Sequence, residues 1–293
     1  MIGRGRPAAG AVAAALLTAC SSPGAMLRPA PAGLAPRPPA AVASDVALVI
    51  YSHGSREEFL ADRCAPRGDT TPSVVRDLVG ARIAGFRLAV YADCTPTRRG
   101  DFVAAQHAGA PKVEERAADL ERLIERFWAA GLPPQRIVLM GHSAGAWASL
   151  WTARDADPPV AGVIAVAPAF AGPARTRSAG WRWLREVHER ELAASRRLPA
   201  LVFAFRDDAF ETPQTLSFLE RIPGVDLVAV PPAGADPPAC AGATAHRAIF
   251  TPCFEREQQA RIRAFLAHVL VPGGVAPAAA AGQDARRAAR PEP

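Results

Sequence analysis

The stretch Gly141-His142-Ser143-Ala144-Gly145 has the residue types and spacing of a turn that presents a reactive serine. An apolar segment, residues 137–140, precedes it, and a run compatible with a helix, residues 146–153, follows it. Glycines two positions to either side of the serine let a strand and a helix approach closely, while the sharp turn exposes the hydroxyl. Such a serine can attack an ester or amide carbonyl. The alternative is a glycine-rich turn without chemistry.

Nucleophilic attack by a serine requires a base that takes its proton, a carboxylate that orients the base, and N–H donors for the oxyanion. The elements that would position these groups alternate along the chain. Apolar runs predict strands, and runs with 3.6-residue periodicity or Pro at the first turn predict helices. The expected strands are residues 46–51, 86–91, 137–140, 163–166, 201–205 and 225–230, and the expected helices are residues 73–80, 112–130, 146–154, 213–221 and 255–271. This order predicts an open, mostly parallel sheet of about six strands with helices on both faces.

With the serine turn in place, residues 45–271 resemble the α/β-hydrolase family, including its esterase and dienelactone-hydrolase-like members. In that family the acid follows the second strand after the serine, and the histidine follows the last strand. The resemblance therefore implies Asp208 as the acid, with Asp207 as the alternative, because Arg206-Asp207-Asp208 follows the strand 201–205. It implies His246 as the base, since this is the single histidine between residues 231 and 255. Many family members have two further strands before the first strand expected here.

The resemblance also implies the donors of the oxyanion hole. They are the N–H of Ala144, which follows the serine, and an N–H of the loop after the first strand. That strand ends in Ser52-His53-Gly54-Ser55, so Ser55 is the expected second donor and Arg56 the alternative. No metal or organic cofactor is implied.

The first residues have the features of a targeting signal. Arg4 and Arg6 precede a short apolar run, Gly10 to Leu17, which is too short to span a membrane as a helix. The run ends in Leu17-Thr18-Ala19-Cys20, which resembles the lipobox of bacterial lipoprotein precursors. The resemblance implies cleavage before Cys20 and lipid modification of Cys20. In a bacterium with two membranes it implies anchoring to the outer membrane facing the periplasm, and in one with a single membrane it implies anchoring on the outer surface. A secretory signal with a chance cysteine is the alternative.

Four further cysteines, Cys64, Cys94, Cys240 and Cys253, form an even set in a chain expected to reach an oxidising compartment. Of the three possible pairings, proximity in sequence favours Cys64–Cys94 and Cys240–Cys253. Four reduced thiols are the alternative.

The charge distribution gives little support to nucleic-acid binding. Residues 1–44 and 272–293 together hold seven arginines and two acidic residues, which account for five of the six net positive charges of the 293-residue chain. Residues 45–271 are thus nearly neutral, and they carry no basic stripe with interleaved aromatic residues.

These observations divide the chain into a signal peptide (residues 1–19), a Pro- and Ala-rich tether that starts at Cys20 (20–44), a hydrolase domain (45–271) and a disordered tail (272–293). Residues 168–198 are either a lid or one surface helix whose Trp residues pack on the sheet. The expected function is hydrolysis of a carboxylic ester, or a related acyl bond, of a small-molecule substrate. The alternative is an envelope binding or scaffold lipoprotein on a hydrolase fold with little or no turnover.

Overall fold

The computed structural model describes residues 26–27, 44–54, 71–93, 112–231 and 244–271. Their strands form one sheet in the order β1-β4-β2-β5-β6-β7-β8, in which all neighbours are parallel, and β3 pairs antiparallel with β4. The strands are β1 (Met26–Leu27), β2 (Val46–Ser52), β3 (Arg82–Ile83), β4 (Phe86–Asp93), β5 (Ile137–His142), β6 (Gly162–Val166), β7 (Ala200–Phe205) and β8 (Val225–Val230). The six expected strands are all present, and the predicted fold class is confirmed.

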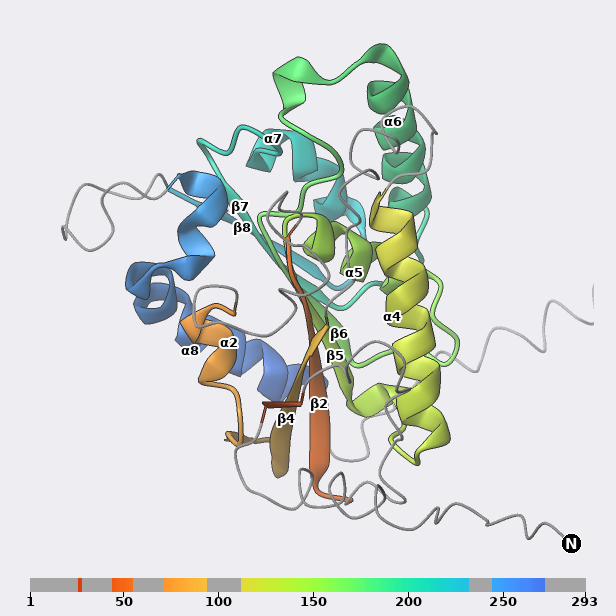
Figure 1. Ribbon diagram of the computed structural model, residues 1–293, viewed down its shortest axis with the longest axis vertical. Helices are drawn as coiled ribbons and strands as arrows, with labels where there is room; N and C mark the ends of the chain where they lie inside the picture. Colours follow the sequence, from red (N-terminus) through yellow and green to blue (C-terminus); the bar gives the residue numbers. More distant parts are fainter. Residues whose placement is uncertain (1–25, 28–43, 55–70, 94–111, 232–243, 272–293) are drawn as a thin grey trace, which may run out of the picture.

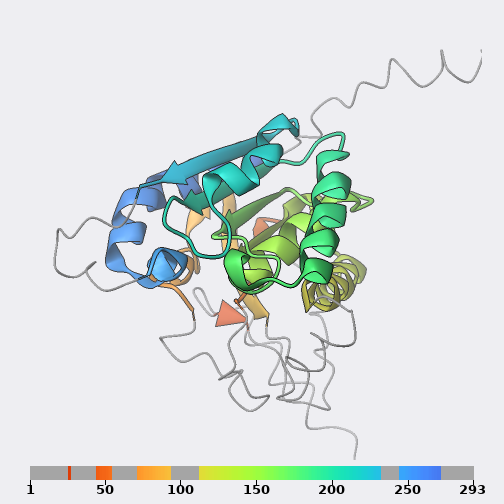
Figure 2. The ribbon, with the colours of Figure 1, turned by 90° about the horizontal axis from the view of Figure 1, so that it is seen from above.

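Helices cover both faces of this sheet, as Figures 1 and 2 show. They are α2 (Ser73–Arg76), α4 (Lys112–Ala129), α5 (Ala144–Arg154), α6 (Ala179–Ala193), α7 (Pro213–Leu216) and α8 (Pro252–Val269). Short 3₁₀ turns complete the set: η2 (Pro134–Arg136), η3 (Ala174–Thr176), η4 (Ser217–Arg221) and η6 (Ala245–Phe250). Helices α4, α5 and α6 lie on one face, and α2 and α8 lie on the other.

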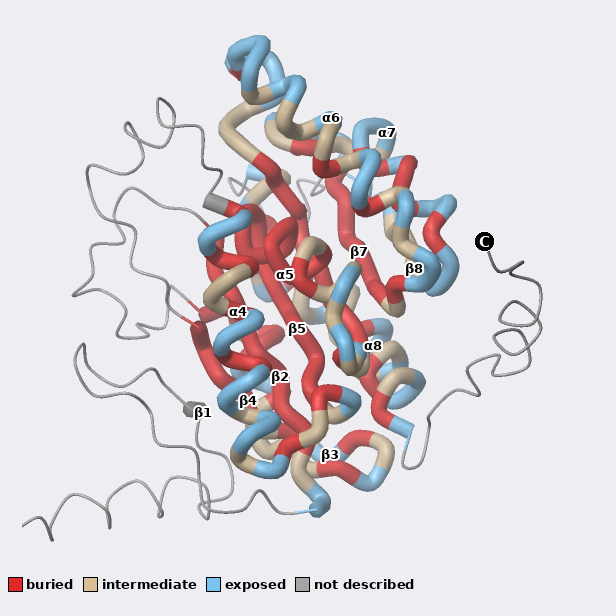
Figure 3. The backbone as a smooth tube through the Cα atoms, turned by 90° about the vertical axis from the view of Figure 1, so that its right-hand side faces the viewer, coloured by how far each residue is buried: buried red, intermediate tan, exposed pale blue. Residues whose placement is uncertain are grey.

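The strand sequences explain this layering. Strand β2 is apolar almost throughout, and successive side chains of a strand point to opposite faces. Leu48 and Ile50 accordingly pack in the core with α4 and α5, whereas Ala47 and Val49 pack in the core with α2 and α8. The inner strands are therefore buried on both faces, and in Figure 3 they form the buried centre of the molecule. A strand with helices on both faces needs such a continuous apolar sequence.

Several elements depart from the sequence expectations. The 73–80 helix ends at Arg76, and a turn over residues 77–80, in which Gly80 has a positive φ of 76°, leads the chain into β3. The last helix begins three residues earlier than expected, at Pro252, because the Thr251 hydroxyl accepts a hydrogen bond from the Phe254 N–H and caps the helix. Strand β1 lies within the segment interpreted as a tether.

Two tryptophans are more exposed than the sequence pattern suggested. The 3.6-residue periodicity of residues 112–130 predicts Trp128 on the apolar face of α4, but its side chain is 50% exposed. In the 168–198 segment, which contains η3 and α6, Trp181 packs against the core but Trp183 is 62% exposed. Helix α6 itself packs against α5 and η4.

The strand order reverses its direction between β2 and β5, the topological switch point of the sheet. The connection from β2 leads to β4 on one side, and β5 to β8 then continue on the other side. Ligands of open α/β sheets bind outside the carboxyl ends of strands at such a reversal. The serine turn at the end of β5 lies at this point.

Candidate active site

The turn between β5 and α5 holds Ser143 in a strained backbone conformation. Its φ of 56° and ψ of −124° are uncommon for a residue with a side chain. The flanking glycines are required by close contacts: a Cβ on Gly141 would lie 2.4 Å from the carbonyl of Gly145, and one on Gly145 would lie 2.2 Å from the carbonyl oxygen of Ser52. Strand β2, strand β5 and helix α5 therefore meet with no room for a methyl group.

His246 lies in η6, between β8 and α8, and its ring reaches Ser143. The distance from His246 Nε2 to Ser143 Oγ is 2.8 Å, and that from His246 Nδ1 to Asp208 Oδ2 is also 2.8 Å. Because Nδ1 faces a carboxylate, it carries the proton, and Nε2 is the acceptor for the Ser143 hydroxyl. The imidazole is thus in the tautomer that can accept the serine proton.

Asp208 follows β7, and its side chain is fully buried. Its second oxygen, Oδ1, accepts a hydrogen bond of 2.8 Å from the backbone N–H of Phe210. Both carboxylate oxygens therefore have a partner, which fixes the orientation of the group. Asp207, the alternative acid, is exposed to solvent. Of the two aspartates, the structure brings Asp208 to His246.

Two aromatic side chains that the sequence analysis did not single out contact His246. The ring of Phe210 stacks on the imidazole, with centroids 4.0 Å apart and planes 26° apart. His142 Nε2 donates a hydrogen bond of 2.7 Å to the backbone carbonyl of His246. In the sequence, His142 occupies the variable position of the serine turn, between Gly141 and Ser143. The position of His142 next to Ser143 could have identified it as a residue of the site, whereas nothing in the sequence distinguished Phe210.

The loop after β2 runs beside the serine and is held by a buried arginine. A Cβ on Gly54 would lie 2.9 Å from Ser143 Cβ. Arg116 of α4 donates hydrogen bonds to the carbonyl oxygens of His53 and Gly54, the latter at 3.5 Å. Burial lowers the pKa of Arg116, although the charge of Asp93 opposes this effect. The sequence analysis did not anticipate the role of Arg116.

The other predicted positions are only partly covered by the structure. Ala144 is the first residue of α5 and is buried. Cys253 is buried in the first turn of α8. Outside the described residues lie Ser55, Arg56, Cys20, Cys64, Cys94 and Cys240.

The part of the chain that the structure describes offers neither a metal cluster nor a membrane-spanning helix. Among these residues, no group of three or more His, Cys, Asp or Glu side chains is arranged to hold a metal ion. None of the helices in this part of the chain is both long enough and apolar enough to cross a membrane.

A lipase and an esterase are among the known structures that share this α/β-hydrolase fold. A monoacylglycerol lipase from Paleococcus ferrophilus superposes with a TM-score of 0.50 and 18% identity, over 76% of this chain and 94% of that one. A thermophilic esterase from Thermogutta terrifontis, solved with propionate bound, gives a TM-score of 0.51 and 13% identity, over 84% and 88%. No family model and no curated protein matches the chain. The likeness establishes the fold.

Proposed function

We propose that this protein is a serine hydrolase that cleaves a carboxylic ester, or a related acyl bond, through an acyl-enzyme on Ser143. The observation that carries the proposal is the continuous hydrogen-bonded chain from Ser143 through His246 to Asp208, with both side-chain distances at 2.8 Å. The strained turn that exposes the Ser143 hydroxyl supports it independently. The names of the lipase and the esterase with the same fold are compatible with an ester substrate.

In the first step His246 Nε2 takes the proton of the Ser143 hydroxyl while the oxygen attacks the substrate carbonyl. The oxyanion that forms accepts hydrogen bonds from the N–H of Ala144 and, in this proposal, from that of Ser55, with Arg56 as the alternative donor. Ala144 suits this role because the first N–H groups of a helix have no partner within the helix. Asp208 stabilises the positive charge that develops on the imidazole.

In the second step His246 donates its proton to the leaving alkoxide, and the alcohol departs. A water molecule then gives a proton to His246 and attacks the acyl carbonyl, which releases the acid and restores Ser143. Every step uses groups of this chain and water.

The first test is labelling of the full-length protein, purified in mild detergent, with a fluorophosphonate probe. We expect the wild type to be labelled and the variants Ser143→Ala and His246→Ala to remain unlabelled, while all three give the same circular dichroism spectrum. Hydrolysis of p-nitrophenyl esters of increasing chain length would then define the acyl group. A folded wild type that is neither labelled nor active on esters would refute the proposal and favour the binding lipoprotein.

We further propose that the domain is anchored in the cell envelope, at the outer membrane facing the periplasm. The support is the order of features in residues 1–20, which ends at Cys20. Metabolic labelling with an alkyne fatty acid should mark the wild type and the control variant Cys253→Ser but not Cys20→Ser. Label retained by Cys20→Ser would count against a lipid on Cys20.

In that compartment we expect disulfides Cys64–Cys94 and Cys240–Cys253. Cys253 lies at the start of α8, directly after the turn that carries His246, so a link to Cys240 would brace that segment. Peptide mapping without reduction should recover both linked pairs. Free thiols on all four residues of protein isolated from the envelope would contradict this expectation.

A further inference from the structure

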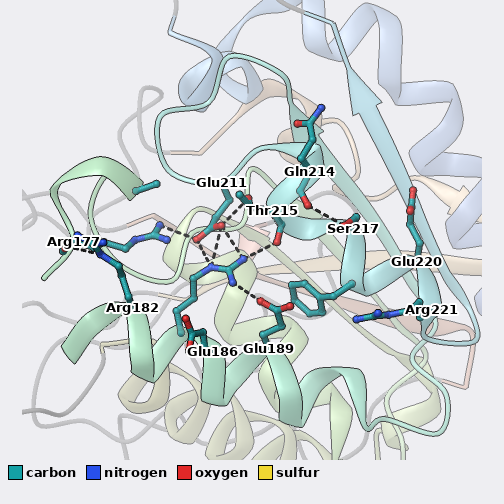
Figure 4. Close-up of a pocket in the computed structure, with 13 residues that line it drawn as sticks. Arg177, Arg182, Glu186, Glu189, Glu211, Gln214, Thr215, Ser217, Glu220 and Arg221 are labelled. Carbon is teal, nitrogen blue, oxygen red and sulfur yellow. Dashed lines mark hydrogen bonds and ion pairs between the residues drawn. The ribbon is translucent and has the colours of Figure 1, made fainter. Parts of the chain in front are cut away.

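A largely buried cluster of three charged side chains forms around Glu211, in the loop that carries the triad acid. Glu211, three residues beyond Asp208, has a side chain that is 0% exposed, and it forms ion pairs with Arg177 and Arg185. Arg177 Nη2 lies 2.7 Å from Glu211 Oε1, and Arg185 Nε lies 3.0 Å from the same oxygen. The Thr215 hydroxyl donates a further hydrogen bond of 2.9 Å to Glu211 Oε2. Figure 4 shows these contacts converging on Glu211.

The cluster joins two separate parts of the chain. Arg177 precedes Ser178, the N-cap of α6, and Arg185 lies within α6, whereas Glu211 belongs to the loop between β7 and α7. A polar cavity of about 800 Å³ adjoins the cluster and is bounded by residues of α6, α7 and η4. Glu211 and the exposed Glu186 of α6 both line this cavity.

Such a cluster is a costly way to gain stability. Moving charged groups out of water costs several kcal/mol for each ion, and a buried ion pair often stabilises a fold no more than apolar residues of the same volume would. Burial lowers the pKa of Arg177 more than the charge and hydrogen bond of Glu211 raise it. For Arg185, burial also lowers the pKa, but its contacts with Glu211 and Glu189 outweigh that effect. The role of the cluster is therefore better read from which groups its side chains hold in place than from the stability that it adds.

Those contacts lead to the triad through the backbone of a single residue, Phe210. Arg177 Nη2 donates to the carbonyl oxygen of Phe210 at 2.9 Å, and the N–H of Phe210 donates to Asp208 Oδ1 at 2.8 Å. The ring of the same Phe210 stacks on His246. Phe210 is thus fixed at its carbonyl by the cluster, and it contacts both the acid and the base. Arg177 also interacts electrostatically with Asp208.

We propose that Glu211, together with Arg177 and Arg185, is the positioning element of the triad, which holds the backbone of Phe210 and thereby the Asp208 carboxylate and the His246 ring. These three charged residues do not touch the reacting atoms. Their effect passes through Phe210 to Asp208, and the inference rests on the hydrolase function proposed above. A displacement of about 1 Å in a catalytic group can reduce the rate about 100-fold, so a modest shift of this loop is sufficient to be measured.

The test is a double-mutant cycle of Glu211→Gln and Asp208→Asn in the full-length protein, with Glu186→Gln as the matched control. We expect Glu211→Gln to lower kcat for a short-chain p-nitrophenyl ester, and the rate constant for fluorophosphonate labelling, by about 10- to 100-fold. KM should change less than about threefold, because the acid loop positions the triad and not the substrate. Glu186→Gln should change neither constant more than about twofold, as expected for an exposed side chain that lines the same cavity.

The Asp208→Asn background separates positioning from a general loss of stability. If Glu211 acts through Asp208, adding Glu211→Gln to Asp208→Asn should cost less than about twofold, because the asparagine no longer holds His246 in the productive tautomer and its exact placement has little left to contribute. Equal losses in both backgrounds, or a wild-type kcat for folded Glu211→Gln, would overturn the inference.

A second variant covers the case in which Glu211→Gln does not fold. Arg177→Lys keeps the positive charge beside Glu211 but replaces the planar fork, which bonds Phe210 and Glu211 at once, by a single ammonium group. We expect kcat to fall at least about fivefold, again with little further loss in the Asp208→Asn background. A folded Arg177→Lys with wild-type kcat would overturn the inference. A wild type without labelling or esterase activity would refute the hydrolase function, and this inference would fall with it.

Discussion

Exchange of Asp208 for asparagine tests the hydrogen-bonded chain with the smallest change of shape. In the wild type, Asp208 Oδ1 accepts from the Phe210 N–H, and Oδ2 accepts from His246 Nδ1. An asparagine has one acceptor oxygen, and the Phe210 N–H, which can only donate, holds that oxygen. The amide NH₂ then faces His246 Nδ1, which must become an acceptor.

This exchange moves the imidazole proton to Nε2, the atom 2.8 Å from Ser143 Oγ. His246 then donates to Ser143 and cannot take its proton. We expect kcat to fall by about 10⁴-fold, the size of effect seen when a triad histidine is held in the wrong tautomer. That factor corresponds to about 5.5 kcal/mol of transition-state stabilisation. The fold should be retained, because asparagine has nearly the shape of aspartate and keeps the hydrogen bond from Phe210.

The assay is hydrolysis of a short-chain p-nitrophenyl ester together with the rate of fluorophosphonate labelling. Asp207→Asn is the matched control, since it makes the same chemical change on the neighbouring exposed residue, and we expect its kcat to stay within about twofold of the wild type. A loss below about tenfold for Asp208→Asn, or an equal loss for Asp207→Asn, would refute the assignment of the acid.

Three further predictions concern the surroundings of the site. Gly145→Ala, whose new methyl group would lie 2.2 Å from a backbone oxygen of β2, should lower the free energy of unfolding in urea by about 3 kcal/mol, whereas Gly180→Ala, with nothing within 4 Å, should stay within about 1 kcal/mol of the wild type. Burial lowers the pKa of His188 below its ordinary value of 6.5, although its hydrogen bond to Glu114 acts in the opposite direction. As the pH falls below 6.5, His188 therefore takes up a proton in the unfolded chain before it does so in the folded one. The free energy of unfolding should then decrease by at most about 1.4 kcal/mol per pH unit until the pH reaches the lower pKa of the folded state. This part of the pH dependence should be absent in His188→Gln. Arg116→Lys should lower the free energy of unfolding in urea by about 1–3 kcal/mol and slow fluorophosphonate labelling, because one ammonium group cannot bind both carbonyls that the guanidinium binds. Wild-type values in both assays would contradict the role given to Arg116.

The parts of the fold that could be predicted depend on local pattern. Strand β2 was recognisable because a strand covered on both faces has to be apolar throughout. Ser143 was recognisable from its turn, and Asp208 and His246 from the chain order that the resemblance to the α/β-hydrolase family implies; the structure joins the three by hydrogen bonds. Their catalytic roles remain a prediction. Trp128 was misplaced because periodicity marks a helix face but does not say how far the neighbouring element extends over it.

The buried arginines could not be predicted for a different reason. Arg177, Arg185 and Glu211 are residue types that normally lie at the surface, and their burial depends on contact between segments about 30 residues apart in sequence. Nothing in either segment alone distinguishes them from solvated charges. The same holds for Arg116, which meets the β2 loop across a separation of more than 60 residues.

A common physical reason accounts for arginine at both places. At the carboxyl edge of the sheet the ladder of backbone hydrogen bonds ends, so carbonyl groups of the buried loops need other donors. Arg177 supplies donors to the carbonyls of Ala171, Gly172 and Phe210 with a single side chain. Arg116 does the same for the loop beside Ser143. A guanidinium has five N–H groups in a fixed plane, so it satisfies several carbonyls and also sets their relative positions. Arg116 of α4 and Arg177, just before α6, thereby hold the loops on which the proposed triad depends.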